Sequence, residues 1–256
     1  MITNIRCLIK ACEDLNLKCT QFPDAPNLIS VQKNNLNYYF VNCTTPLNSQ
    51  DISKISLDKD FTWKVLKNAI NMPETISFID PFVGKEFQNY TREQSLEEMA
   101  MKIINLFGED VIVKMNKGER KRNVYSCSSK SEIIEALSNI FNHNSKDYDY
   151  IALAQRKITI KSEFRVIILN KKIELVYKKW SFVKVSEVEI IDSLSAFIFP
   201  IFNTLNLNYA GLDIALDRED KLWLIEINTA PRFAPYVKKN GEKDIISLQK
   251  KVLQSI

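Results

Sequence analysis

The chain has 256 residues, of which 45% are apolar and 26% charged, and this is the length and composition of a globular protein with one large core or two smaller ones. The formal net charge of +4 is too small to make nucleic acid the main partner. Five cysteines without a CxxC pair and a single histidine exclude the ligand set of a zinc site. Because no signal-peptide pattern is recognisable and no apolar run approaches the roughly 20 residues that cross a bilayer, we expect a cytoplasmic protein with reduced thiols and no membrane partner.

The N-terminal part predicts one helix and two strands. Apolar residues at helical spacing predict a helix over residues 5–16. Two short runs rich in β-forming residues, 27–34 and 36–43, predict a pair of strands around a polar turn. The stretch 44–56 contains many turn residues and is expected to be a joint.

Helices and strands alternate from there to about residue 147. Asp58 or Asp60 is expected to cap the first of these helices, because an aspartate side chain accepts hydrogen bonds from the free amides of a first helical turn. Gly108 is expected to end a later helix. We expect helices over 58–70, 95–108 and 129–142, and strands over 75–80, 110–116 and 124–129.

Strands dominate from about residue 148 onward. This second half predicts an antiparallel sheet with a helix packed on it, which places the chain in the α+β class. We expect strands over 148–155, 163–169, 171–180, 209–216 and 221–228, and a helix over 187–206.

Three oxygen-bearing side chains stand out on the last two of these strands. Glu226 and Asn228 lie on the same face of one strand, about 6–7 Å apart along the backbone, because side chains alternate between faces. A polar turn joins this strand to the preceding one, so that Asp213 is expected opposite them. Two carboxylates and an amide oxygen suit Mg²⁺, which commonly bridges to nucleotide phosphates. The alternative is a buried network of polar side chains without a metal.

The stretch GLDIALDREDKLWLIEINTAPRF, residues 211–233, resembles the signature of the ATP-grasp superfamily. That signature has an aspartate on one strand, a polar turn, and a second strand ending in Glu-x-Asn with a proline three residues later. The upstream segments SLDKDFTWKVLKNAI, DVIVKMNKGERKRN and YIALAQRKI resemble the family's Asp-Lys-x-x-Thr helix, its lysine strand with phosphate loop, and its adenine-binding hinge, in the same order. The similarity runs from about Thr45 to Tyr236 and is greatest to amino-acid and peptide ligases, such as the cyanophycin, glutathione and ribosomal-protein glutamate ligases.

The resemblance implies an α+β ATP-grasp fold in which two lobes grip ATP. It implies a short N-terminal α/β segment over residues 1–55, a central lid lobe over 56–154, and a C-terminal lobe with the metal site over 155–256.

The resemblance also implies how ATP is held. The phosphates would meet Lys114, Lys59, and the arginines of the loop NKGERKRN, whose single glycine departs from the glycine-rich loop of the family. The alternative for these cations is a solvated surface position, which the apolar neighbours of Lys114 argue against. Glu163 corresponds to the ribose carboxylate, with an ion pair to Arg165 as the alternative. The predicted ATP contacts are Lys59, Lys114, Arg120, Arg122, Gln155, Arg156, Lys157, Ile158 and Glu163, and the predicted metal ligands are Asp213, Glu226 and Asn228.

Three further residues are predicted to act on the reacting groups. Arg165 would face the transferred phosphate. Either Lys178 or Lys179 would point inward, because neighbouring strand residues face opposite ways, and we prefer Lys178. Arg232 replaces the glycine that the family usually has there, and it would either clamp a substrate carboxylate or narrow the site.

The resemblance implies an ATP-dependent carboxylate–amine ligase that works through an acyl phosphate, using one or two Mg²⁺ ions with Mn²⁺ as a substitute. We expect an amino acid or peptide as substrate, and the short N-terminal segment favours a peptide or protein tail as acceptor. One alternative is a degenerate ATP-grasp protein that binds nucleotide without ligating. Another is a nucleic-acid-binding module built on KGERKRN and YKKW, against which the modest net charge argues. Because many members of the family are dimers or tetramers, the resemblance leaves a homodimer as an alternative to a monomer.

Overall fold

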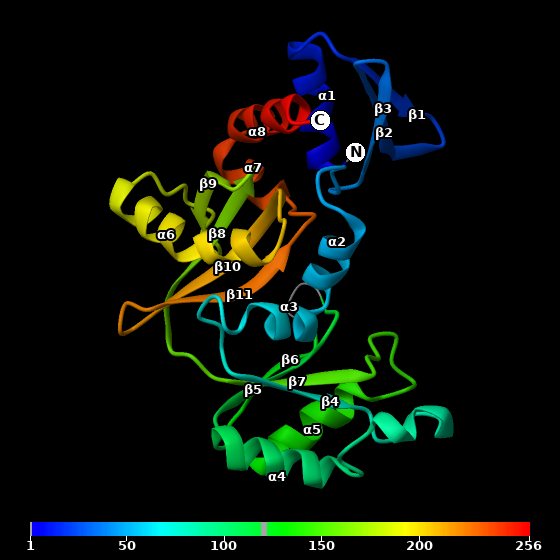
Figure 1. The fold of residues 1–256 in the computed structure, drawn as a ribbon, viewed down its shortest axis with the longest axis vertical. Helices are drawn as coiled ribbons and strands as arrows, with labels where there is room; N and C mark the ends of the chain where they lie inside the picture. The colour runs from blue at the N-terminus through cyan, green and yellow to red at the C-terminus, as the bar shows by residue number, and fades with distance from the viewer. Residues whose placement is uncertain (1, 119–121) are drawn as a thin grey trace. The chain divides into compact units, whose positions relative to one another are not determined.

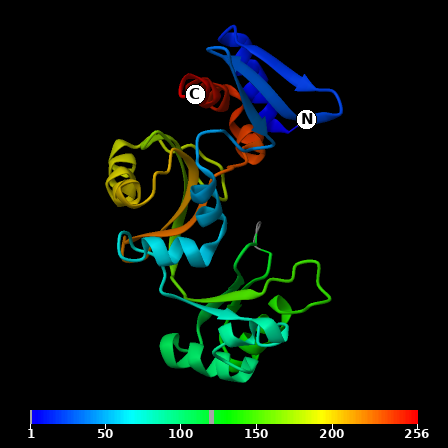
Figure 2. The same cartoon turned by 45° about the vertical axis from the view of Figure 1, so that its right-hand side comes forward.

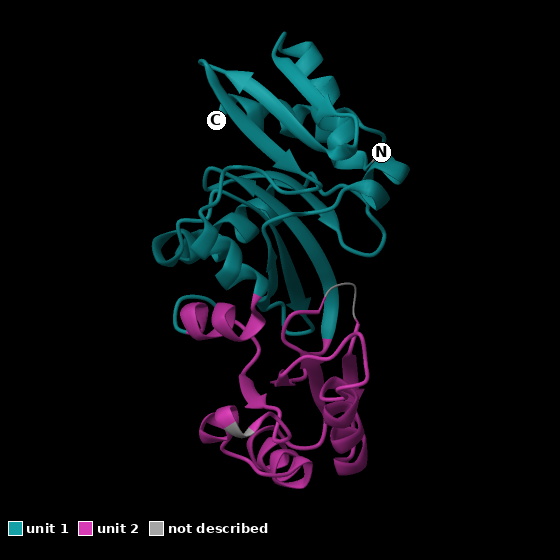
Figure 3. Cartoon of the chain, turned by 90° about the vertical axis from the view of Figure 1, so that its right-hand side faces the viewer, with its two compact units in different colours: residues 1–57, 68–71, 160–256 teal, residues 58–67, 72–159 magenta. Residues whose placement is uncertain are grey.

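The computed structural model describes residues 2–118 and 122–256. The chain divides into two compact units (Figure 3). Unit 1 comprises residues 1–57, 68–71 and 160–256, and unit 2 comprises residues 58–67 and 72–159. Helices mixed with antiparallel sheets in both units confirm the predicted α+β class. Among the described residues, no helix combines the length and the apolar character needed to cross a bilayer.

The larger sheet of unit 1 has four antiparallel strands in the order β11-β10-β8-β9. Helix α6 (Val188–Thr204) lies against this sheet (Figure 1 and Figure 2) and buries a stripe of apolar residues that includes Leu194 and Ile198. The strands are β8 (Ile160–Leu169), β9 (Lys172–Lys178), β10 (Tyr209–Asp217) and β11 (Leu222–Asn228).

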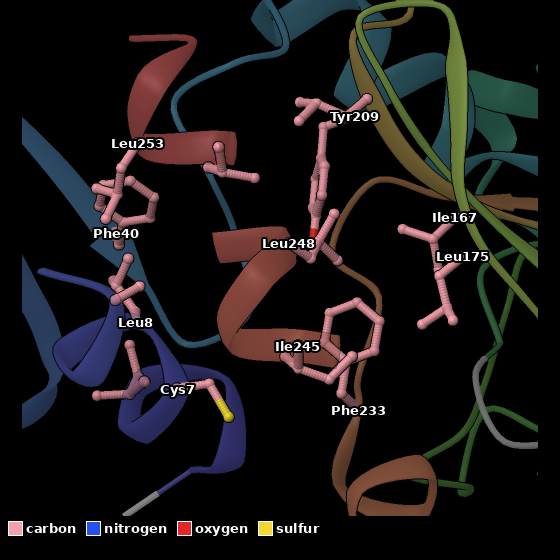
Figure 4. Packing of buried hydrophobic residues seen from close by; sticks show 14 of the residues in the cluster. Cys7, Leu8, Phe40, Ile167, Leu175, Tyr209, Phe233, Ile245, Leu248 and Leu253 are labelled. Carbon is pink, nitrogen blue, oxygen red and sulfur yellow. The ribbon is translucent and has the colours of Figure 1, made fainter. Parts of the chain in front are cut away.

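The N-terminal part of unit 1 is a helix and a three-stranded sheet that share a core with the C-terminal residues. The elements are α1 (Thr3–Asp14), β1 (Lys18–Phe22), β2 (Ala25–Lys33), β3 (Leu36–Val41), α2 (Gln50–Leu57), α7 (Ala234–Asn240) and α8 (Lys243–Gln254). Helix α1 packs on α8, and both helices share a hydrophobic core with residues of the larger sheet. Figure 4 shows this shared core, with Cys7, Leu8, Phe40, Ile167, Leu175, Tyr209, Phe233, Ile245, Leu248 and Leu253 labelled.

Unit 2 is a four-stranded antiparallel sheet in the order β4-β7-β5-β6, with helices packed on it. Side chains cap three of its helices: Asp58, one of the two expected caps, and also Ser95 and Ser129 each accept a hydrogen bond from a first-turn amide. The elements are α3 (Lys59–Leu66), β4 (Thr75–Ile79), the 3₁₀ helix η1 (Lys85–Tyr90), α4 (Leu96–Phe107), β5 (Val111–Met115), β6 (Val124–Cys127), α5 (Lys130–Ile140) and β7 (Ile151–Arg156).

Two expectations about the sheets and joints are wrong. Strand β7 does not belong with the strands that follow it, because it pairs with β4 and β5 in unit 2. The alternation within a strand fixes which face is buried, but it does not identify the partner strand. The expected joint over 44–56 contains helix α2, whose apolar residues are too few to signal a helix by themselves.

We expect Leu8→Ala to lower the free energy of unfolding by about 2–5 kcal/mol, because the side chain lies fully inside the core shared by α1, α8 and the larger sheet. Glu13→Ala on the exposed face of the same helix should change it by less than about 0.5 kcal/mol. Urea unfolding followed by circular dichroism measures both values. Equal values would show that α1 is not anchored through its apolar face.

Candidate active site

A row of four polar side chains crosses the larger sheet of unit 1. Asp213 on β10 is the register partner of Glu226 on β11 and of Arg165 on β8, and Arg165 is in turn the partner of Tyr177 on β9. Directly opposed residues point to the same face of a sheet, so all four share one face. The predicted hairpin and the predicted pairing of Asp213 with Glu226 are therefore confirmed.

Asp213 is the centre of this row and is bound by two cations. It is only 2% exposed. The Arg165 guanidinium donates to both of its oxygens, through Nε to Oδ1 and through Nη2 to Oδ2 at 3.0 Å. Lys179 Nζ lies 2.7 Å from Oδ2. Bidentate arginine–carboxylate pairs are among the stronger polar contacts in proteins, so the cluster holds the charged groups in a defined geometry.

Burial and the charges in the row together set the protonation of its members. Burial lowers the pKa of Arg165, but the charge of Asp213, the hydrogen bond to it and the charges of Tyr177 and Glu226 together outweigh burial, so that the pKa is raised and Arg165 stays a cation. Burial raises the pKa of Tyr177 to about 12, with the charge of Arg165 acting in the opposite direction. Tyr177 therefore stays a neutral phenol beside the guanidinium at neutral pH.

Lys179, and not Lys178, faces the row. The prediction that Lys178 points inward is wrong, because Lys178 is exposed and is the register partner of apolar Phe164. Lys179 shares the side of Tyr177, two residues earlier, and its amide donates to the Glu163 carbonyl at 2.9 Å. The sequence predicts that Lys178 and Lys179 point to opposite faces of the strand. Which of the two faces the row depends on the register between β8 and β9, which the sequence does not show.

Glu163 carries a buried oxygen without a hydrogen bond. Its Oε2 lies 3.8 Å from Lys179 Nζ and has no hydrogen-bond partner among the described residues. Buried carboxylate oxygens are normally paired, so this atom is suited to accept a hydrogen bond from a bound molecule.

The predicted metal ligands lie on one face, and their chemistry suits a hard cation. Asp213 opposes Glu226, and Asn228 opposes Gly211, two register pairs further along and therefore on the same face. A β-bulge beside the Asp213–Glu226 pair leaves Ile225 as an extra residue, and such bulges often occur next to active sites. Oxygen donors fit Mg²⁺, but both Asp213 oxygens also serve Arg165 and Lys179.

Gly211 makes room for the guanidinium, and the sequence did not single it out. A Cβ atom at this position would lie 3.0 Å from Arg165 Cδ and 3.1 Å from Pro231 Cβ. Glycine in a strand interior often marks such a close approach, and that is the signal that could have identified it.

The predicted phosphate contacts lie in unit 2. Lys59 Nζ donates to the carbonyl oxygens of Asn116 at 3.1 Å and Gly118 at 2.8 Å, so it holds the start of the loop that follows β5. Lys114 is buried on β5. Arg122 forms an ion pair of 2.6 Å with Asp147. Arg120 and its neighbour Lys121 lie outside the described residues.

The predicted hinge begins at the end of β7 and continues beyond it. Ile158 is partly buried there and precedes the boundary between the units at 159/160. The polar side chains of the hinge are paired within unit 2, Gln155 with Thr75 at 2.7 Å, Arg156 with Glu74 at 2.7 Å and Lys157 with Asp110 at 2.6 Å.

Comparison with solved structures identifies the fold. A D-alanine-D-alanine ligase from Coxiella burnetii matches with a TM-score of 0.58 and 16% identity, over 80% of this chain and 59% of that one. The ATP-grasp ligase PsnB, complexed with a precursor peptide and AMPPNP, matches with a TM-score of 0.56 and 17% identity, over 81% and 60%. A RimK domain protein from Sphaerobacter thermophilus matches with a TM-score of 0.58 and 12% identity, over 80% and 70%.

These similarities show that the chain has the ATP-grasp fold, as the sequence predicted. The chain spans about three-fifths of the length of the first two ligases. No protein-family model and no curated protein matches the sequence. At 12–17% identity, the likeness to solved structures establishes the fold.

We expect Asp213→Asn to lower the free energy of unfolding by about 3–5 kcal/mol in metal-free buffer, because it leaves two poorly exposed cations without their counter-charge. The matched control is Asp220→Asn, which breaks an exposed pair with Lys161 and should cost less than about 1 kcal/mol. Urea unfolding compares the two variants. Similar losses would show that Asp213 is effectively solvated.

Proposed function

We propose that the chain carries the catalytic core of an ATP-dependent carboxylate–amine ligase acting on an amino acid or a peptide. The observation that supports this most is the row of Glu226, Asp213 and Arg165, joined by Lys179, on a sheet of the ATP-grasp fold. The row combines oxygen donors for a divalent cation with cations for phosphate, which is the set of charges that a phosphoryl transfer from ATP needs.

The proposed reaction has two steps. A carboxylate oxygen of the substrate attacks the γ-phosphorus of ATP, the bond to the bridging oxygen breaks, and ADP leaves with an acyl phosphate formed. The nitrogen of an amine then attacks the acyl carbon and loses a proton, and inorganic phosphate leaves. The chain contributes position and charge, and no side chain forms a covalent intermediate.

The residues of the row and Asn228 would have two roles, one group binding phosphate and the other binding the metal. Arg165 and Lys179 would stabilise the charge on the transferred phosphate, since both are held as oriented cations by Asp213. Asp213, Glu226 and Asn228 would hold Mg²⁺, which when bound neutralises charge on the phosphate oxygens. PsnB, with the same fold, is described in complex with Mg and ADP.

Other residues would bind the ribose, the α- and β-phosphates and the adenine of ATP. The Oε2 atom of Glu163, which has no hydrogen-bond partner among the described residues, would accept a hydrogen bond from a ribose hydroxyl. Lys114 would bind the α- and β-phosphates, Lys59 would fix the loop through its carbonyls, and the backbone of residues 155–158 would hold adenine.

A nucleotide-binding protein without ligase activity is the second candidate. The observation that favours it is the saturation of Asp213, whose two oxygens are both bound by cations and are therefore poorer metal ligands. ATP binding without any activated carboxylate would identify this case.

The first test is incubation with Mg-ATP, hydroxylamine, and pooled amino acids and short peptides, followed by mass spectrometry. We expect an acyl hydroxamate, because hydroxylamine captures an acyl phosphate. The double variant Glu226→Gln, Asn228→Ala should reduce its formation by about a hundredfold or more, since it removes two of the three proposed metal ligands. Asp220→Asn is the control. Undiminished hydroxamate in the double variant would exclude this metal site.

The two neighbouring lysines offer a matched comparison. We expect Lys179→Ala to lower hydroxamate formation by about a hundredfold, because the ammonium beside Asp213 and its contact with phosphate are lost. Lys178→Ala removes the same charge one residue away on an exposed side chain and should leave the rate within about twofold. Equal losses would contradict the assignment of Lys179.

A further inference from the structure

A side chain of the N-terminal helix is bonded to the backbone on both sides of Arg232. Asn4 lies in the first turn of α1 and is 4% exposed. Its Nδ2 donates to the Pro231 carbonyl at 2.9 Å, and its Oδ1 accepts from the Phe233 amide at 3.2 Å. These contacts join residues more than 220 positions apart in the sequence.

Residues 231–233 lie in irregular chain between β11 and α7, so the Pro231 carbonyl and the Phe233 amide are not paired by the hydrogen bonds of a helix or a sheet. Buried backbone groups need partners, and one asparagine amide supplies an acceptor and a donor at the correct spacing. Pro231 and Phe233 are buried, while Arg232 between them is exposed. The contacts therefore fix the main chain on both sides of Arg232, whose side chain is exposed.

This segment lies beside the charged row. Pro231 Cβ and Arg165 Nη1 lie 3.1 and 3.2 Å, respectively, from the point that a Cβ atom of Gly211 would occupy. Gly211 is two residues before Asp213 on β10. A shift of Pro231 would therefore change the surroundings of the Arg165 guanidinium as well as the origin of the Arg232 side chain.

Contacts other than those of Asn4 also attach α1 to the rest of unit 1. Arg6 and Lys10 each contact Glu242 at 2.5 Å, and the apolar face of the helix is buried in the shared core. Loss of the asparagine amide would leave the helix docked. The contacts of Asn4 with residues 231 and 233 therefore stabilise the position of that segment more than the position of the helix.

We propose that Asn4 is a positioning residue, which holds Arg232 next to the Arg165–Asp213–Lys179 cluster so that Arg232 binds the carboxylate of the acid substrate. This inference rests on the proposed ligase function. A guanidinium recognises a carboxylate through two parallel hydrogen bonds, and this geometry requires a fixed origin for the arginine side chain.

The test compares Asn4→Ala with Leu8→Ala, which weakens the same helix but keeps the Asn4 amide and its two hydrogen bonds. In Asn4→Ala we expect faster hydrogen exchange at the Phe233 amide. We also expect a KM about tenfold or more higher for the amino acid or peptide that the wild-type protein converts to a hydroxamate, with the KM for ATP unchanged. Leu8→Ala should lower the melting temperature and leave both properties as they are.

A double-variant cycle isolates the role of Arg232. If Asn4 acts through Arg232, adding Asn4→Ala to Arg232→Ala raises the KM no further. A full additional increase, an unchanged KM in Asn4→Ala, or unchanged exchange at the Phe233 amide would overturn the proposal. If the wild-type protein forms no hydroxamate, the ligase function fails, and the exchange rate still decides whether Asn4 holds the segment.

Discussion

The ion pair between Arg165 and Asp213 is the interaction on which the C-terminal sheet depends. Asp213 lies in the middle of a strand and is almost fully buried, where an unpaired carboxylate would be too costly to keep charged. Arg165 binds both oxygens and Lys179 adds a second positive charge. Gly211 is small because the guanidinium passes over it. One buried charge therefore explains the residue types at three surrounding positions.

The same ion pair connects the stability of the sheet with the proposed chemistry. Without a nucleotide, Asp213 keeps Arg165 and Lys179 in place. Under the proposed function, phosphate oxygens are alternative partners for the two cations, and their arrival leaves Asp213 available to a divalent metal. Under this proposal, an internal carboxylate keeps the site folded and oriented until the polyanionic substrate replaces it.

The N-terminal residues are a structural part of unit 1. The N-terminal helix and three-stranded sheet share their core with α7, α8 and the larger sheet. Through this packing, Asn4 on helix α1 contacts the segment after β11, at Pro231 and Phe233. The N-terminal segment is therefore linked to the proposed site by its packing and by the hydrogen bonds of Asn4.

The sequence by itself determined the class of fold, most helices and strands, and the pairing of Asp213 with Glu226, because caps, alternation and a short hairpin turn are local signals. It did not assign β1, α7 or α8, and it placed β7 in the wrong sheet. Only the tertiary structure decided that Lys179 and not Lys178 faces Asp213, that Gly211 accommodates Arg165, and that Asn4 meets Pro231 and Phe233. The physical reason is that register between strands and contacts across more than 200 residues depend on how whole elements pack, which the pattern of any one segment does not contain.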